Sequence, residues 1–210
     1  MRGVLITVEG VEGSGKTTQC RLLAEWLRGQ GHRVRGTSEP DGSPIGAAIR
    51  AIFEQDGLTP LTEALLFTAA RQQHVAQVIR PALDTGEIVI SDRYADATLA
   101  YQGYGRGLDL QTIRELNALA TGGVLPDLTL LLDLEPGVGL ERLGGRARDA
   151  FERLDLAFHE KVRQGYLELA REEKNRIVVL DAQQPLDRLQ AEIRKAVGDL
   201  LRQRGLARGV

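Results

Sequence analysis

A glycine-rich stretch near the start of the chain, GVEGSGKT at residues 10–17, constrains the fold more than any other feature. It follows the apolar run VLITVE at residues 4–9 and precedes TQCRLLAEWL, which has the apolar spacing of a helix. The stretch matches the pattern GxxxxGK followed by Ser or Thr, in which the loop between a strand and a helix cradles phosphates. Glycines allow the tight turn, and backbone N–H groups at the helix N-terminus attract anions. This context predicts a phosphate-binding loop.

The loop residues have distinct expected roles. Lys16 is expected to reach the β- and γ-phosphates of a nucleoside triphosphate, and Thr17 to hold Mg²⁺. The full set expected to contact phosphate is Gly10, Val11, Glu12, Gly13, Ser14, Gly15, Lys16, Thr17 and Thr18. The alternative, a glycine-rich turn with a solvated lysine, is disfavoured because a strand precedes the loop and a helix follows it.

The loop alone does not name a reaction, because kinases, GTPases and motor ATPases all use it. The sequence has no Asn-Lys-x-Asp signature of a GTPase and no LSGGQ signature of a transporter ATPase. A compact chain of 210 residues with arginine-rich loops favours a small-molecule kinase. The length also predicts a single domain over residues 1–210.

Apolar runs of strand length alternate with longer amphipathic stretches along the chain. The predicted strands cover residues 4–9, 32–38, 87–92, 128–134 and 176–181, and helical patterns include residues 62–74 and 156–172. Strands that are nearly continuous in Val, Ile and Leu are typical of parallel sheets buried on both faces. The pattern therefore predicts an α/β fold with a five-stranded parallel sheet flanked by helices. The glycine-rich segments YQGYGRG (101–107) and GGRARD (144–149) are expected to be mobile loops.

Carboxylates stand at or just after the ends of the predicted strands: Glu9, Glu39, Asp92, Asp133 and Asp181. Ligands of open α/β sheets bind outside the carboxyl ends of the strands, so this edge is expected to carry a metal-bearing site. In ISDRY, Asp92 is expected to bind Mg²⁺ directly or through water, and Arg93 to grip an acceptor phosphate. The alternative is a surface ion pair between neighbouring charges.

The helical stretch TEALLFTAARQQH places Phe67 and Arg71 on one face, because they are four residues apart. An aromatic ring beside a guanidinium group is suited to stacking on a base and donating to its carbonyl edge. Taken alone, the pair is more often a core phenylalanine beside a surface arginine.

Composition limits the partners. The formal net charge of -2 argues against a nucleic-acid-binding surface. The single cysteine, Cys20, cannot form an internal disulfide, and no stretch has the roughly 18 apolar residues of a membrane span, so a cytoplasmic location is expected. His32, His74 and His159 lack paired metal-ligand spacing and are expected to serve packing or solvent contact.

Several motifs in register resemble those of the bacterial thymidylate kinase family: GVEGSGKT, SEPDGS, LLFTAAR, ISDRY and AYQGYGRG, followed by FHEKVRQGYLELA and VLDAQQP. The resemblance covers nearly the whole chain. It implies a P-loop kinase fold with a mobile lid at about residues 142–153. It also implies transfer of the γ-phosphoryl group of ATP to dTMP with Mg²⁺, giving dTDP for dTTP synthesis, and assembly as a homodimer.

The resemblance also implies roles for individual residues. Phe67 matches the ring that stacks on thymine, and Arg71 the donor to its O4. The remaining dTMP contacts implied are Thr98 and Gln102 at the base edge, Tyr101 near the deoxyribose, and Arg50 and Arg93 at the phosphate. Lys16, Asp92, Arg93, Glu39 and the lid arginine Arg146 match the catalytic set, with Asp92 and Glu39 as the acidic pair near Mg²⁺.

Three departures from the family pattern stand out. The family usually has Arg-Glu-Pro-Gly-Gly where this chain has SEPDG, so Ser38 replaces an arginine and Asp41 adds a negative charge. In the lid, RDAFE puts Ala150 at a usual arginine position, and an alternative alignment uses Arg153. Ala97 stands where Ser is common. These departures leave two other functions open. The protein is then a kinase for a different nucleoside or nucleotide, or a catalytically weak nucleotide-binding regulator.

Overall fold

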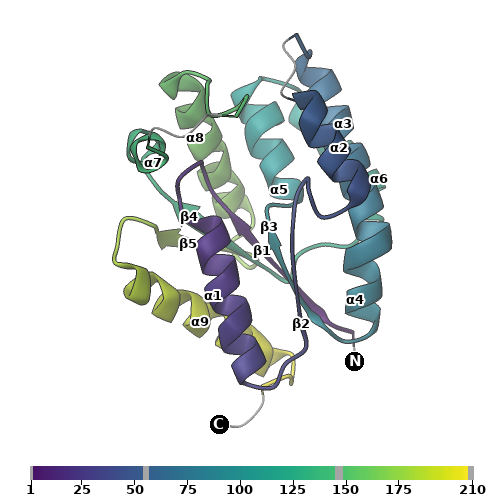
Figure 1. Ribbon diagram of the computed structural model, residues 1–210, viewed down its shortest axis with the longest axis vertical. Coiled ribbons are helices and arrows are strands. Elements are labelled where there is room, and N and C mark those ends of the chain that lie inside the picture. The colour runs from purple at the N-terminus through teal and green to yellow at the C-terminus, as the bar shows by residue number, and fades with distance from the viewer. Residues whose placement is uncertain (1, 54–56, 145–148, 208–210) are drawn as a thin grey trace.

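The fold is organised around a parallel sheet. The structure is a computed structural model that describes residues 2–53, 57–144 and 149–207 (Figure 1). Within these residues, five strands pair in the order β2-β3-β1-β4-β5, all parallel. The strands are β1 (Val4–Glu9), β2 (Val34–Ser38), β3 (Ile88–Asp92), β4 (Leu128–Asp133) and β5 (Ile177–Asp181). The predicted five-stranded parallel sheet is confirmed, with strand ends shifted by at most two residues.

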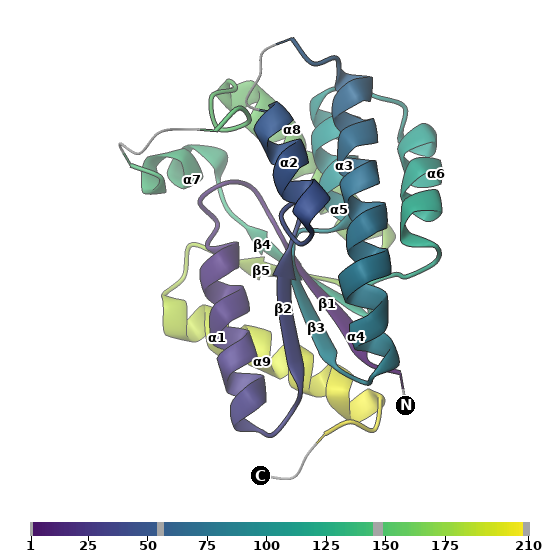
Figure 2. The same cartoon turned by 45° about the vertical axis from the view of Figure 1, so that its right-hand side comes forward.

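Helices cover both faces of the sheet. Figures 1 and 2 show α1 (Lys16–Gly29) and α9 (Leu186–Gln203) on one side, where they contact each other. The opposite side carries α3 (Pro60–His74), α4 (Arg80–Asp84), α5 (Ala95–Thr98), α6 (Leu110–Thr121) and α8 (Leu156–Glu172). Two π-helical segments, η1 (Val75–Ile79) and η2 (Leu99–Gly105), and the helices α2 (Pro44–Phe53) and α7 (Pro136–Arg142) complete the described elements. Right-handed crossovers between parallel strands account for this distribution.

Local sequence sets the starts of several helices. The side chains of Thr59, Asp109 and Asp155 accept hydrogen bonds from the first-turn N–H groups of Thr62, Thr112 and Phe158. Such N-caps satisfy donors that have no partner inside the helix. The helical pattern predicted for residues 156–172 coincides with α8.

The glycine-rich segment at 101–107 is not the loop that its composition predicts. Residues 101–105 belong to η2, and Tyr101, Gln102 and Gly103 are buried. A Cβ on Gly103 would lie 2.5 Å from a methyl carbon of Leu110, and one on Gly105 would lie 2.7 Å from the Phe158 ring. These glycines therefore permit close packing against α6 and α8, and the expectation of a mobile loop was wrong. Most of the other segment expected to be a loop, residues 145–148, lies outside the described residues.

Candidate active site

A cavity of about 630 Å³ lies at the carboxyl ends of β1, β2 and β3. One wall is the glycine-rich loop between β1 and α1. The opposite wall comes from α2, α3 and η2, and residues 142–143 and 149–152 close a third side. The chain therefore brings the predicted phosphate loop and the predicted acceptor residues to the same cavity, at the sheet edge where ligands of such folds bind.

The glycine-rich loop has the backbone geometry that its sequence predicts. Gly10, Gly13 and Gly15 have φ values of 143°, 70° and 89°, in the region that side chains disfavour. A Cβ on Gly13 would also lie 2.1 Å from the carbonyl oxygen of Gly139. The loop leads directly into α1, whose N-terminal N–H groups face the cavity mouth where an anion is attracted.

Lys16 folds back onto its own loop. Its Nζ atom donates to the carbonyl oxygens of Gly10 at 3.0 Å and Val11 at 2.8 Å. Burial, together with the nearby charge of Arg93, lowers the pKa of Lys16 from 10.5 to about 8. The buried ammonium group has carbonyl oxygens as partners here, and an anionic phosphate would stabilise its charge further.

Thr17 and Asp92 meet at the mouth of the cavity. The Thr17 hydroxyl donates to a carboxylate oxygen of Asp92 at 2.6 Å, and both residues line the cavity. Hydroxyl and carboxylate oxygens are ligands that Mg²⁺ prefers. Among residues 2–53, 57–144 and 149–207, no group of three or more His, Cys, Asp or Glu side chains has an arrangement that holds a metal. Mg²⁺ often uses only one or two protein ligands together with substrate phosphates, so this pair fits the ion.

The other strand-end carboxylates divide between two environments. Glu39 lines the cavity beside Asp92. Asp133 accepts from Arg163 at 2.6 Å, Asp181 accepts from the N–H of Gln183 at 2.8 Å, and Glu9 is fully buried. Of the five carboxylates expected at a metal-bearing edge, only Glu39 and Asp92 line the cavity.

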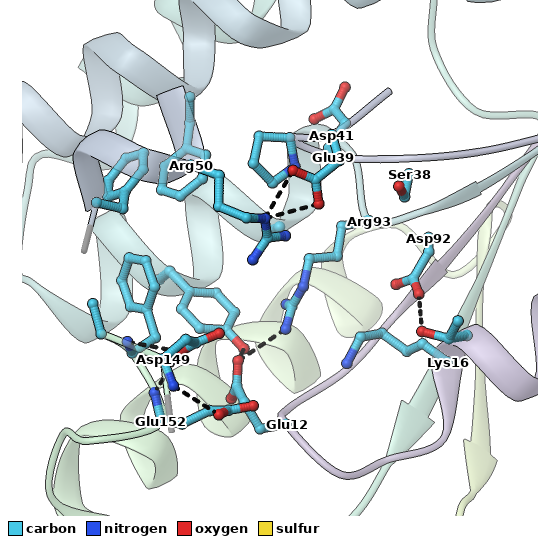
Figure 3. A pocket seen from close by; sticks show the side chains of 18 of the residues that line it. Glu12, Lys16, Ser38, Glu39, Asp41, Arg50, Asp92, Arg93, Asp149 and Glu152 are labelled. Atoms are coloured by element: carbon cyan, nitrogen blue, oxygen red, sulfur yellow. Dashed lines mark hydrogen bonds and ion pairs between the residues drawn. The ribbon is translucent and has the colours of Figure 1, made fainter. Parts of the chain in front are cut away.

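Arg93 reaches into the cavity from a strained turn. Its φ of 71° is left-handed, a conformation that costs a residue with a side chain about 1–3 kcal/mol. The guanidinium group donates to Glu12 at 2.8 Å and stacks over the Tyr101 ring at 4.9 Å (Figure 3). Arg93 therefore joins the phosphate loop to η2, and the alternative considered from the sequence, a surface ion pair with Asp92, is not among the ion pairs of the described residues.

Glu12 is the centre of a buried cluster. The Tyr101 hydroxyl donates to its Oε1 at 2.5 Å, and His159 Nδ1 lies 3.3 Å from its Oε2. Burial alone would raise the pKa of Glu12, but the contact with His159 and the charges of Arg93 and Lys16 hold that pKa well below its ordinary 4.5. Sequence reasoning assigned His159 to packing and missed this contact, because α8 gives no local sign of meeting the phosphate loop.

Arg71 is buried and bound on every nitrogen. Nε donates to Glu39 at 2.9 Å, and Nη1 donates to Thr98 at 3.0 Å and to Asn117 at 2.7 Å. Nη2 donates to the carbonyl oxygen of Tyr94 at 2.9 Å and lies 2.8 Å from the Glu39 carboxylate. Asn117 is a second residue that sequence reasoning missed, because it reaches Arg71 from α6.

Glu39 has a further partner that stiffens this wall. Nδ1 of His74 lies 3.2 Å from its Oε1, and Nε2 of His74 lies 2.7 Å from the Thr37 hydroxyl on β2. The carboxylate thus lies in an ion pair with Arg71 as well as at the cavity wall.

Phe67 lies in an aromatic group on the same wall. Its ring stacks on Phe53 with centroids 4.1 Å apart and an angle of 17°, and Phe151 is tilted against it at 5.9 Å. Nearby, the Gln102 side chain donates to Glu63 at 3.3 Å. Thr98, Gln102 and Phe67 all line the cavity, which brings the predicted base-reading residues together.

Arg50 forms an ion pair with Asp41, one of the departures noted in the sequence. Nε of Arg50 lies 2.8 Å from both carboxylate oxygens (Figure 3). The pair is about half exposed at the cavity rim. Asp41 therefore occupies the guanidinium group that is expected to hold a phosphate.

The segment after the undescribed residues forms a compact turn. The backbone N–H of Asp149 donates to Glu152 at 3.0 Å, and the N–H of Glu152 donates to Asp149 at 2.9 Å (Figure 3). Ala150 lines the cavity within this turn, and Arg153 is exposed just beyond it. Arg146, the predicted lid arginine, lies outside the described residues.

Comparisons with known proteins agree with this geometry. The family model described as thymidylate kinase matches residues 8–193. A thymidylate kinase of Deinococcus radiodurans is 50% identical over 201 residues, covering 94% of this chain and 98% of the relative. One of Syntrophotalea carbinolica is 55% identical over 194 residues, covering 87% and 89%. The crystal structure of thymidylate kinase from Ehrlichia chaffeensis superposes with a TM-score of 0.80 at 33% identity, covering 94% of this chain and 100% of that one. With its parallel α/β sheet, phosphate loop and facing acceptor wall, the chain belongs to the thymidylate kinase family and has its P-loop kinase fold.

Proposed function

We propose that this protein transfers the γ-phosphoryl group of ATP to dTMP, giving dTDP and ADP for dTTP synthesis. The observation that carries the proposal is the shared cavity. A phosphate loop forms one wall, and an aromatic ring with buried hydrogen-bonding groups forms the other. Membership of the thymidylate kinase family supports the same reaction.

On the donor side, the loop N–H groups and Lys16 bind the ATP phosphates. ATP binding exchanges the Lys16 contacts with Gly10 and Val11 for contacts with phosphate oxygens. Thr17 and Asp92 would hold Mg²⁺, with Asp92 acting directly or through water, and the bound ion would supply neutralisation of the charge on the ATP phosphates.

On the acceptor side, Arg93 and Arg50 bind the dTMP phosphate. Phe67 stacks on thymine, Arg71, Thr98 and Gln102 read its edge, and Tyr101 packs near the sugar. The acceptor phosphate has a second pKa of about 6 and is mostly dianionic at neutral pH, so its oxygen attacks without a strong general base. Catalysis then depends on positioning and charge neutralisation. Glu39 has a supporting role here, because its carboxylate fixes Arg71.

The remaining assignments come from the sequence: the lid and the homodimer from the family resemblance, and the others from length, net charge and composition. Arg146, on a lid at about residues 142–153, stabilises the transferring phosphoryl group. The protein works as a single-domain homodimer in the cytoplasm, with no nucleic-acid or membrane partner. No helix in the described part of the chain has the length and apolar character needed to cross a bilayer.

A panel assay tests the proposal. The purified protein is incubated with ATP, Mg²⁺ and a set of nucleosides and nucleoside monophosphates, and ADP release is followed. We expect turnover that is highest with dTMP. The preference over dUMP rests on one methyl group, which is worth about 1–3 kcal/mol in an apolar pocket. Turnover with another acceptor points to a different nucleotide kinase, and ATP binding without turnover points to a regulator; either result contradicts the proposal.

A further inference from the structure

Glu9, the last residue of β1, is buried and does not line the cavity. Its side chain is 0% exposed and reaches Tyr166 of α8. Its Oε1 accepts a hydrogen bond from the backbone N–H of Tyr94 at 2.7 Å, and its Oε2 accepts one from the Tyr166 hydroxyl at 2.8 Å. A buried carboxyl group is costly unless its oxygens are paired, so these two contacts define its local role.

The Tyr94 N–H belongs to the peptide that follows Arg93, the strained residue of the acceptor wall. Three contacts fix this turn. The Arg93 N–H donates to the Val8 carbonyl oxygen at 3.0 Å, the Ser91 hydroxyl donates to the Arg93 carbonyl oxygen at 2.7 Å, and Glu9 accepts from the next N–H. A left-handed residue with a side chain persists only where its surroundings enforce it. Glu9 supplies one of the enforcing contacts, from a fully buried position outside the cavity lining.

We propose that Glu9 is a positioning residue for the acceptor phosphate. By accepting from the Tyr94 N–H, Glu9 holds the Arg93–Tyr94 peptide in the orientation that directs the Arg93 guanidinium into the cavity. The same peptide leads into α5, which carries Thr98, so the contact also sets the starting point of the base-reading wall. This inference rests on the proposed function of Arg93 as a ligand of the dTMP phosphate.

Two substitutions separate positioning from bulk packing. Glu9→Gln keeps an oxygen that accepts from the Tyr94 N–H, whereas Glu9→Met fills a similar volume without an acceptor. We expect the Gln variant to retain kcat/KM for dTMP within about threefold, and the Met variant to lose about tenfold or more, the effect of removing one buried hydrogen bond. KM for ATP should change by less than about twofold in both, because the phosphate loop keeps its own contacts.

A double-mutant cycle on dTMP binding tests whether Glu9 acts through Arg93. The dissociation constant for dTMP is measured by calorimetry for Glu9→Met in the wild-type and Arg93→Ala backgrounds. If Glu9 acts through Arg93, the substitution weakens binding about tenfold in the first background and less than about twofold in the second. Equal losses in both backgrounds, or a loss in Glu9→Gln as large as in Glu9→Met, overturn the proposal.

Amide hydrogen exchange covers the case in which Glu9→Met does not fold. In the wild-type protein the Tyr94 amide should be protected to the level of the neighbouring β3 amides, and rapid exchange at Tyr94 overturns the proposal without any variant.

Tyr166→Phe is the matched control, because it removes the other Glu9 contact and leaves the Tyr94 contact, so kcat/KM for dTMP should stay within about threefold. If the wild-type protein does not phosphorylate dTMP at all, the proposed function fails, and the exchange measurement still decides whether Glu9 fixes the turn.

Discussion

Replacing Asp41 by asparagine should strengthen dTMP binding, because Asp41 competes with the acceptor phosphate for Arg50. The pair joins side chains that are 47% and 40% exposed, and such an ion pair contributes at most about 1 kcal/mol. A phosphate bound by Arg50 also lies near the Asp41 carboxylate. Two like charges about 4 Å apart in water repel by about 1 kcal/mol. The sum of about 1–2 kcal/mol corresponds to a dissociation constant lowered about 5- to 30-fold.

Calorimetric titration of Asp41→Asn with dTMP, at low and at high ionic strength, measures this effect. The gain should shrink at high ionic strength, because salt screens exposed charges. Asp199→Asn is a matched control, since Asp199 is 41% exposed and pairs with Lys195 on α9, away from the cavity. Unchanged or weaker dTMP binding in Asp41→Asn would refute the reasoning and indicate that Asp41 orients Arg50 productively.

Three further perturbations test the proposed machinery. Burial lowers the pKa of Lys16 to about 8, so the protein without ATP loses the ammonium proton as the pH rises past that value. Calorimetry should therefore show the affinity for ATP falling about tenfold between about pH 7 and pH 9. An affinity that does not change with pH contradicts the role of the ammonium group. Arg71→Leu removes the arginine of the buried ion pair with Glu39, so urea denaturation should show a free energy of unfolding lower by about 3–5 kcal/mol. A change below about 1 kcal/mol would show that the pair is not structurally important. Arg146→Ala should reduce kcat about 10³-fold or more with little change in dTMP affinity, as measured by steady-state kinetics and calorimetry; unchanged turnover would assign the lid role to another arginine.

Features that depend on local pattern were predictable from the sequence. The central strands β1, β3 and β4 are buried on both faces, so their sequences are apolar runs, and each was located within one residue at each end. The phosphate loop was predictable because its glycines and Lys16 stand at fixed spacing between a strand and a helix.

Features that depend on distant partners were not predictable. His159 meets Glu12, and Asn117 meets Arg71, only because α8 and α6 fold against the cavity wall. Composition was also misleading at Gly103 and Gly105, where glycine serves close packing in a helix and not flexibility. One sequence does not distinguish these two uses of glycine, because both require only the absence of a side chain.

The saturation of Arg71 has a consequence for how a base is recognised. Every nitrogen of Arg71 already donates a hydrogen bond within the protein. A base carbonyl that approaches the guanidinium group must therefore displace one of these protein partners. Thr98 is the neutral partner on the cavity wall, and its bond is easier to exchange than the charged bond to Glu39. The net gain is then the small difference between two hydrogen bonds, so we expect Arg71 to fix the position of the ring and stacking on Phe67 to supply most of the affinity.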